Sequence, residues 1–139
     1  MNWQKVSTVL QWVFAFVGAG ICIITVIGFA SSQPDLWPLP ALYFIEIGLM
    51  GLLAVACVSA DKAWASTALW GVVGVLMTFV ILGGFSIGPF LFPALLAFAS
   101  QALLKTRQLG RSIPIGLGLA LLAALVQAGA MFGAIALGA

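Results

Sequence analysis

Histidine is absent from this 139-residue sequence, and charge is scarce: five residues are Lys or Arg and three are Asp or Glu. Without histidine the chain lacks the commonest haem and metal ligand and the usual general base of catalysis. The three acidic residues, Asp35, Glu46 and Asp61, are expected at three different depths, so they do not predict a metal site. We therefore expect a protein that is not an enzyme and that holds no His-ligated haem or metal.

Cysteine is equally sparse, with Cys22 and Cys57 and no C-x-x-C spacing of the kind that redox motifs use. At the helical rise of about 1.5 Å per residue, the two fall on opposite sides of the middle of their helices, too far apart for a disulfide. We expect free thiols that behave as small apolar side chains. The formal charge of +2 is also too small and too dispersed to predict nucleic-acid binding.

Hydrophobic sequence, by contrast, is abundant: 64% of the residues are hydrophobic and the mean hydropathy is +1.27. This composition predicts an all-α integral membrane protein with a single membrane domain, residues 1–139. Five apolar blocks each hold at least the roughly 20 residues that cross a hydrocarbon core. Between the last two blocks, the charged segment KTRQLGRS from Lys105 to Ser112 is read as a connection. We predict a bundle of five transmembrane helices, at about 6–30, 41–60, 63–82, 85–104 and 113–137.

The basic residues set the expected orientation, because short cytoplasmic loops collect Lys and Arg. Five spans place all of the basic residues on one side, whereas a model without the fourth crossing would divide them. The amino terminus is then cytoplasmic and the carboxyl terminus outside, and we expect a bacterial-type plasma (inner) membrane. The residues that share the cytoplasmic side are Lys5, Lys62, Lys105, Arg107 and Arg111.

Glu46 is the only charged residue inside the predicted spans, and an ionisable group at membrane depth indicates pairing or a functional site. One interpretation is a structural hydrogen bond between helices, with a contribution of about 1 kcal/mol. The other is a titrating or cation-binding group on a transport path. Polar residues at the same outer depth lie in the other helices. The candidate polar cluster or ion-binding site is Glu46, Thr25, Thr78, Ser86 and Gln127.

Ser86 has a second expected role, because the turn segment from Gly83 to Pro89 overlaps the start of the fourth predicted helix. A serine just before a helix is a common N-cap, and a proline in the first turn is harmless there. We predict that Ser86 caps this helix. The resulting helix start would face groups in the outer half of the membrane, Glu46 among them.

Small residues in the last predicted helix form a GxxxG pattern that permits close approach of two helix backbones. The predicted packing residues are Gly129, Gly133, Ala130 and Ala134. They fit either packing within a five-helix bundle or contact with another chain.

Two functions follow from these features. The first is a non-catalytic subunit or self-assembling component of a membrane complex, in which small-residue faces dock helices and also lipids or pigments. The second is a small oligomeric channel or transporter in which several copies place Glu46 around a shared ion or proton path. The expected partners are the lipid bilayer and either further copies of the chain or other membrane subunits.

Overall fold

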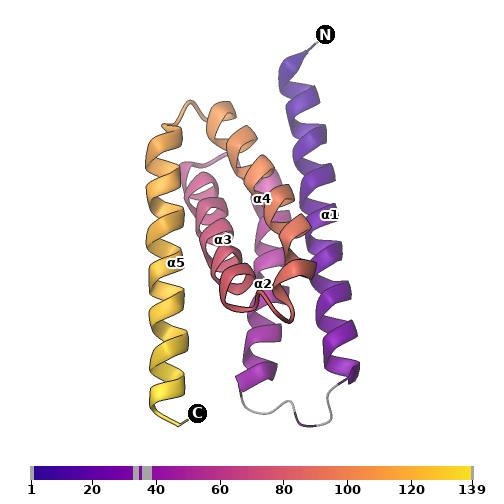
Figure 1. The fold of residues 1–139 in the computed structure, drawn as a ribbon. Coiled ribbons are helices and arrows are strands. Elements are labelled where there is room, and N and C mark those ends of the chain that lie inside the picture. The colour runs from indigo at the N-terminus through magenta and orange to yellow at the C-terminus, as the bar shows by residue number, and fades with distance from the viewer. Residues whose placement is uncertain (1, 33–34, 36–38, 139) are drawn as a thin grey trace.

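The computed structural model describes residues 2–32, 35 and 39–138. Within these residues the chain forms five helices (Figure 1). Each is long and apolar enough to cross a membrane, which confirms the prediction of an all-helical chain with five such segments. The helices are α1 (Trp3–Ser32), α2 (Leu39–Ser59), α3 (Ala63–Leu82), α4 (Gly88–Gln108) and α5 (Ile113–Ala136).

Successive helices run in opposite directions, so the N-terminus and the α2–α3 and α4–α5 connections lie toward the same end of the bundle (Figure 1). Hydrogen bonds join these segments. Gln11 near the start of α1 donates to Gln108 at the end of α4 at 2.7 Å, and Arg111 donates to the Ala63 carbonyl at 3.4 Å. We call this the basic end, because it holds Lys5, Lys62, Lys105, Arg107 and Arg111.

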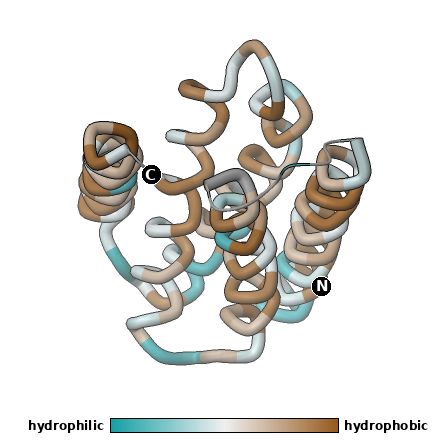
Figure 2. The backbone as a smooth tube through the Cα atoms, turned by 90° about the horizontal axis from the view of Figure 1, so that it is seen from below, coloured by the Kyte–Doolittle hydropathy of each residue, from teal (hydrophilic) through white to brown (hydrophobic). Residues whose placement is uncertain are grey.

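Helix α3 lies at the centre of the bundle and packs against α2, α4 and α5, whereas α1 packs against α2 and α4. Helix α5 leans on α3 and has little contact with α4. Figure 2 views the bundle from the end opposite the basic end, with α5 standing at one side and hydrophobic residues along the helices. Helix α5 therefore has the least covered surface of the five, and only 6% of its most apolar stretch is buried.

Small residues bring the central helices close together. Gly74 of α3 lies against the backbone of Ala120 in α5, and Gly116 of α5 faces the indole ring of Trp70. On the other side of the bundle, Gly18 of α1 faces the ring of Phe98, which is fully buried. A Cβ at any of these glycines would overlap the neighbouring helix, so their lack of a side chain sets the distances between the helices.

Helix α4 begins and ends later than the sequence predicts. Its N-cap is Ile87 without a side-chain bond, so the prediction that Ser86 caps this helix is wrong. The tight α3–α4 turn is closed by the backbone instead: the amides of Ser86 and Gly88 both donate to the Gly83 carbonyl, at 2.8 and 2.7 Å. The Ser86 hydroxyl points back to the same carbonyl, at 3.4 Å.

The carboxyl end of α4 extends through Lys105 to Gln108, where the sequence predicted a connection. Gly110 ends the helix with a φ of 65°, a left-handed conformation that glycine adopts without steric strain. The Arg111 amide donates to the Thr106 carbonyl at 2.9 Å and the Gly110 amide to that of Arg107 at 3.1 Å, the pair of bonds of a Schellman motif. Basic side chains in this last turn also suit the negative end of the helix dipole.

Candidate functional sites

The carboxylate of Glu46, in the apolar helix α2, accepts a hydrogen bond from α5. Gln127 Nε2 donates to Glu46 Oε2 at 3.0 Å, and both side chains are half-buried. The backbones of α2 and α5 scarcely approach each other, so this bond spans a gap between two helices that pack on either side of α3. The contact is therefore a polar bridge at the edge of the bundle.

Thr78 of α3 makes a second polar link to α5, at Ala124, which lies about one helical turn before Gln127. Its hydroxyl lies 2.9 Å from the carbonyl oxygen of Ala124 and 3.3 Å from that of Gly74 in its own helix. A buried hydroxyl needs such a partner, because an unsatisfied polar group is unfavourable in an apolar environment. Thr78 and Gln127 thus both attach α5 to the central helices, at neighbouring levels.

The other two residues of the predicted polar cluster lie apart from Glu46. Thr25 is buried in α1 beside a hollow that Phe90 of α4 also lines, and Ser86 is exposed in the α3–α4 turn. Within the part of the chain that the structure describes, no side-chain hydrogen bond joins either residue to Glu46. The structure therefore brings Glu46 directly to Gln127, with Thr78 nearby.

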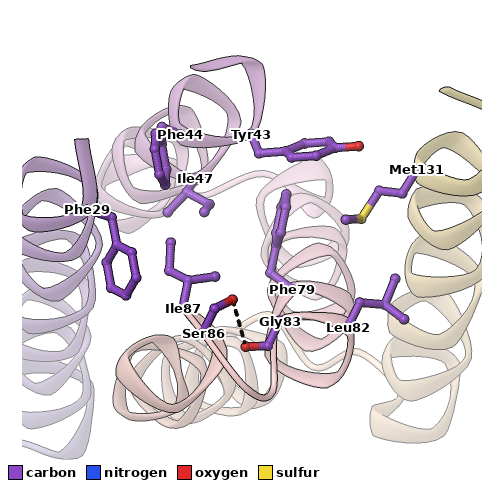
Figure 3. A pocket seen from close by; sticks show the side chains of 10 residues that line it. All are labelled: Phe29, Tyr43, Phe44, Ile47, Phe79, Leu82, Gly83, Ser86, Ile87 and Met131. Atoms are coloured by element: carbon purple, nitrogen blue, oxygen red, sulfur yellow. Dashed lines mark hydrogen bonds between the residues drawn. The ribbon is translucent and has the colours of Figure 1, made fainter. Parts of the chain in front are cut away.

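An apolar recess of about 270 Å³ opens beside this bridge, at the end opposite the basic end. Figure 3 shows its lining from α1, α2, α3, α5 and the α3–α4 turn. Tyr43 packs edge-on against Phe79, with ring centroids 5.7 Å apart, and its hydroxyl points toward the side where Met131 lies (Figure 3). That hydroxyl is buried and has no hydrogen-bond partner among the described residues. The residues that line the recess are Phe29, Tyr43, Phe44, Ile47, Phe79, Leu82, Gly83, Ser86, Ile87 and Met131.

Sequence reasoning missed a charged side chain that is buried near the end of α4. Lys105 of α4 is fully buried, and its Nζ donates to the Val58 carbonyl at 3.1 Å and lies 3.5 Å from Asp61 Oδ1. One turn earlier, Gln101 Nε2 donates to the Ala54 carbonyl at 2.7 Å. The prediction that Lys105 belongs to a connection is therefore wrong, because α4 continues past it and α2 covers its side chain.

The same stretch of α4 carries a buried polar link to α3. Thr106 Oγ1 accepts a hydrogen bond from Trp70 Nε1 at 2.8 Å and lies 2.9 Å from Ser66 Oγ. For the buried contacts of Lys105, the signal available in the sequence was its spacing from Gln101, four residues earlier on the same helical face. That spacing alone does not reveal whether the face meets another helix or the membrane surface.

The sulfur and acidic side chains form no metal-ligating constellation among the described residues, where no group of three His, Cys, Asp or Glu is present. Cys22 and Cys57 are both free thiols and both fully buried. Their burial in the apolar core agrees with the prediction that they act as small hydrophobic side chains.

Three of the four predicted packing residues of α5 are exposed: Gly129, Ala130 and Gly133. A Cβ built at Gly129 or at Gly133 would meet nothing within 4 Å, and Ala130 is exposed. Ala134 is half-buried. Packing within the chain therefore does not use the GxxxG pattern, which is left facing outward.

No protein-family model, no curated protein and no solved structure matches this chain. Its function is therefore inferred from the geometry of its own residues.

Proposed function

We propose that the protein is a non-catalytic component of a membrane assembly, in which the outer face of α5 docks against a transmembrane helix of a second copy or of another subunit. The observation that carries this proposal is the uncovered small-residue face of α5. In the proposed arrangement the basic end is cytoplasmic and the carboxyl terminus is outside, in a bacterial-type plasma membrane.

The two faces of α5 differ in what they contact. Ala120 is 5% exposed and packs on α3, whereas Gly129 follows it by nine residues. At about 100° per residue, nine residues place Gly129 on the opposite side of the helix. Gly133 lies one turn further on, near the same side, and the exposed side chains of Leu122 and Leu125 flank this face.

This geometry suits helix docking in a membrane. Lipid tails are as apolar as leucine, so helices associate there through close van der Waals packing, and small residues allow their backbones to approach. Gly129 and Gly133 have no side chain and nothing within 4 Å of their Cβ positions, so another helix can approach the α5 backbone closely there. The apolar recess lined by Tyr43 and Phe79 offers a place where a lipid chain or a pigment would be held in such an assembly.

Purification from the native membrane in a mild detergent tests this proposal. We expect the wild-type protein to run larger than a monomer, and Gly129→Leu with Gly133→Leu to shift it to the monomer or release its partners. Gly28→Leu is the matched control, because Gly28 in α1 is also exposed and has nothing within 4 Å of its Cβ position. A wild-type protein that runs alone as a monomer would contradict the proposal.

A second candidate function is a small oligomeric channel or transporter that uses Glu46. The supporting observation is that the Glu46 carboxylate is half-exposed in the gap between α2 and α5, with one hydrogen bond from a neutral amide and no ion pair among the described residues. Flux of ions or protons into liposomes, compared between wild type and Glu46→Gln, tests it. An absent flux, or one unchanged by the substitution, eliminates this candidate.

A further inference from the structure

We propose that the basic end carries a binding site for the phosphate-containing headgroup of one anionic phospholipid, between the start of α1 and the end of α4. Five basic residues gather at this end with one acidic residue, Asp61. Asp61 pairs with the buried Lys105, and this is the only ion pair among the described residues. Lys5 and Arg107 therefore present positive charge that no described carboxylate neutralises.

Two neighbouring hollows lie between these helices and share Gln4 and Gln108 in their linings. The first, of about 320 Å³, is lined by Arg107 together with Trp3 and Ser7. The second, of about 490 Å³, contains Lys5. The two hollows adjoin at Gln4 and Gln108, and we call the pair of them the depression. Together they hold a guanidinium group, an ammonium group and several neutral hydrogen-bonding side chains.

These groups match the chemistry of a phosphodiester. A guanidinium group binds two phosphate oxygens through parallel N–H donors, and the Lys5 ammonium adds a flexible point charge. The side-chain amides of Gln4 and Gln108 supply further donors, and the exposed Trp3 indole suits the interface between headgroups and hydrocarbon.

The polar frame of the site is built into the fold. Gln11 is 1% exposed, and its Nε2 donates both to Gln108, at 2.7 Å, and to Ser7, at 3.3 Å. The bond to Gln108, which lines both hollows, ties α1 to α4 at the site. The side-chain oxygen of Gln11, Oε1, is buried without a hydrogen-bond partner among the described residues. The site therefore rests on two clamped helices rather than on a loop.

The apolar surroundings favour a lipid over free phosphate. Leu104 lines the first hollow and Val9 the second, where Val9 is exposed. From Val9 the exposed apolar face of α1 continues through Val13 and Phe16, residues that lie four and seven positions further along the helix. A lipid whose headgroup reaches the second hollow would thus place its acyl chain along this stripe, which a free phosphate ion would leave unused.

The test uses the full chain, purified in mild detergent and stripped of lipid. Native mass spectrometry counts bound lipid, and the rise in thermal unfolding midpoint on titration gives an apparent affinity. The probes are phosphatidylglycerol, phosphatidylcholine and glycerol 1-phosphate. We expect one tightly retained phosphatidylglycerol per chain, little retention of phosphatidylcholine, and no effect of glycerol 1-phosphate at matched concentrations.

Arg107→Gln should weaken phosphatidylglycerol binding by roughly tenfold, because it removes the bidentate charge-assisted bonds. Arg107→Lys keeps the charge, so its affinity for phosphatidylglycerol should lie between that of wild type and that of Arg107→Gln. Arg111→Gln is the control, since it removes the same charge at the same end but outside both hollows. Equal losses for Arg107→Gln and Arg111→Gln, or equal retention of the two lipids, would overturn the proposal. Protection by glycerol 1-phosphate as strong as that by lipid would overturn the choice of a lipid ligand.

Discussion

Replacing Thr106 with Val deletes one hydroxyl from the buried link between α3 and α4 and nearly preserves the shape of the side chain. The hydroxyl lies 2.8 Å from Trp70 Nε1 and 2.9 Å from Ser66 Oγ. The three side chains are almost entirely buried, with relative exposures of 0% for Thr106, 2% for Trp70 and 3% for Ser66. The variant therefore leaves the indole N–H without its acceptor in a dry environment.

The expected destabilisation follows from these two bonds. Side-chain hydrogen bonds between membrane helices contribute about 0.6 kcal/mol on average and up to about 1.7 kcal/mol. Loss of both bonds should therefore lower the free energy of unfolding by about 1–3 kcal/mol. We expect the indole to account for most of this loss, because the Trp70 ring is buried close against the Gly116 backbone, which leaves it little room to reach a new acceptor. Ser66 contributes less, since a helical serine readily bonds a backbone carbonyl of its own helix.

Reversible unfolding in mixed micelles, followed by far-ultraviolet circular dichroism, measures this difference. Thr106→Ser keeps the hydroxyl, and Thr67→Val makes the same chemical change at an exposed position of α3. Both controls should stay within about 0.5 kcal/mol of wild type. A double-mutant cycle with Trp70→Phe should yield a coupling of about 1 kcal/mol. If Thr106→Val is as stable as Thr67→Val, or the coupling is zero, the reasoning about this link is refuted.

Three further outcomes are expected from the same protein. Gly74→Ala should lower the free energy of unfolding by about 1–3 kcal/mol, because the new methyl group meets the α5 backbone. Gly71→Ala is the control, since it has open space around it and should leave this free energy unchanged. Equal effects of the two substitutions would contradict the α3–α5 packing. Glu46→Leu should reduce stability or assembly more than Glu46→Gln, by about 1 kcal/mol, because the glutamine keeps an oxygen that accepts the hydrogen bond from Gln127. Equal and negligible effects would mean that Glu46 faces a wet groove. Cys22 and Cys57 should resist maleimide labelling in the native protein and react fully once it unfolds, since both are 0% exposed; native labelling would argue against this core.

The polar residues illustrate how far sequence reasoning reached. Glu46 and Gln127 stand at a common depth in their helices, and the structure joins them by a hydrogen bond of 3.0 Å. Position along the helix could not separate these two residues from Thr25, which was expected at the same depth. Thr25 instead lines a hollow between α1 and α4. Lys105 was assigned to a connection because charged residues cluster there, although α4 continues past it. Its partners are the Val58 carbonyl of α2, at 3.1 Å, and the Asp61 carboxylate of the α2–α3 connection, at 3.5 Å.

The sequence by itself determined the class of this protein, the number of its helices and the gathering of its basic residues at one end, because bilayer thickness requires apolar segments of about 20 residues and short connections alternate between two sides. Only the tertiary structure decided which face of each helix is covered. In a membrane protein the lipid-facing and helix-facing surfaces are equally apolar, so hydropathy does not separate them. That Gly74 and Gly116 are buried in the bundle while Gly129 and Gly133 face outward depends on how α5 crosses α3, a choice made by three-dimensional packing.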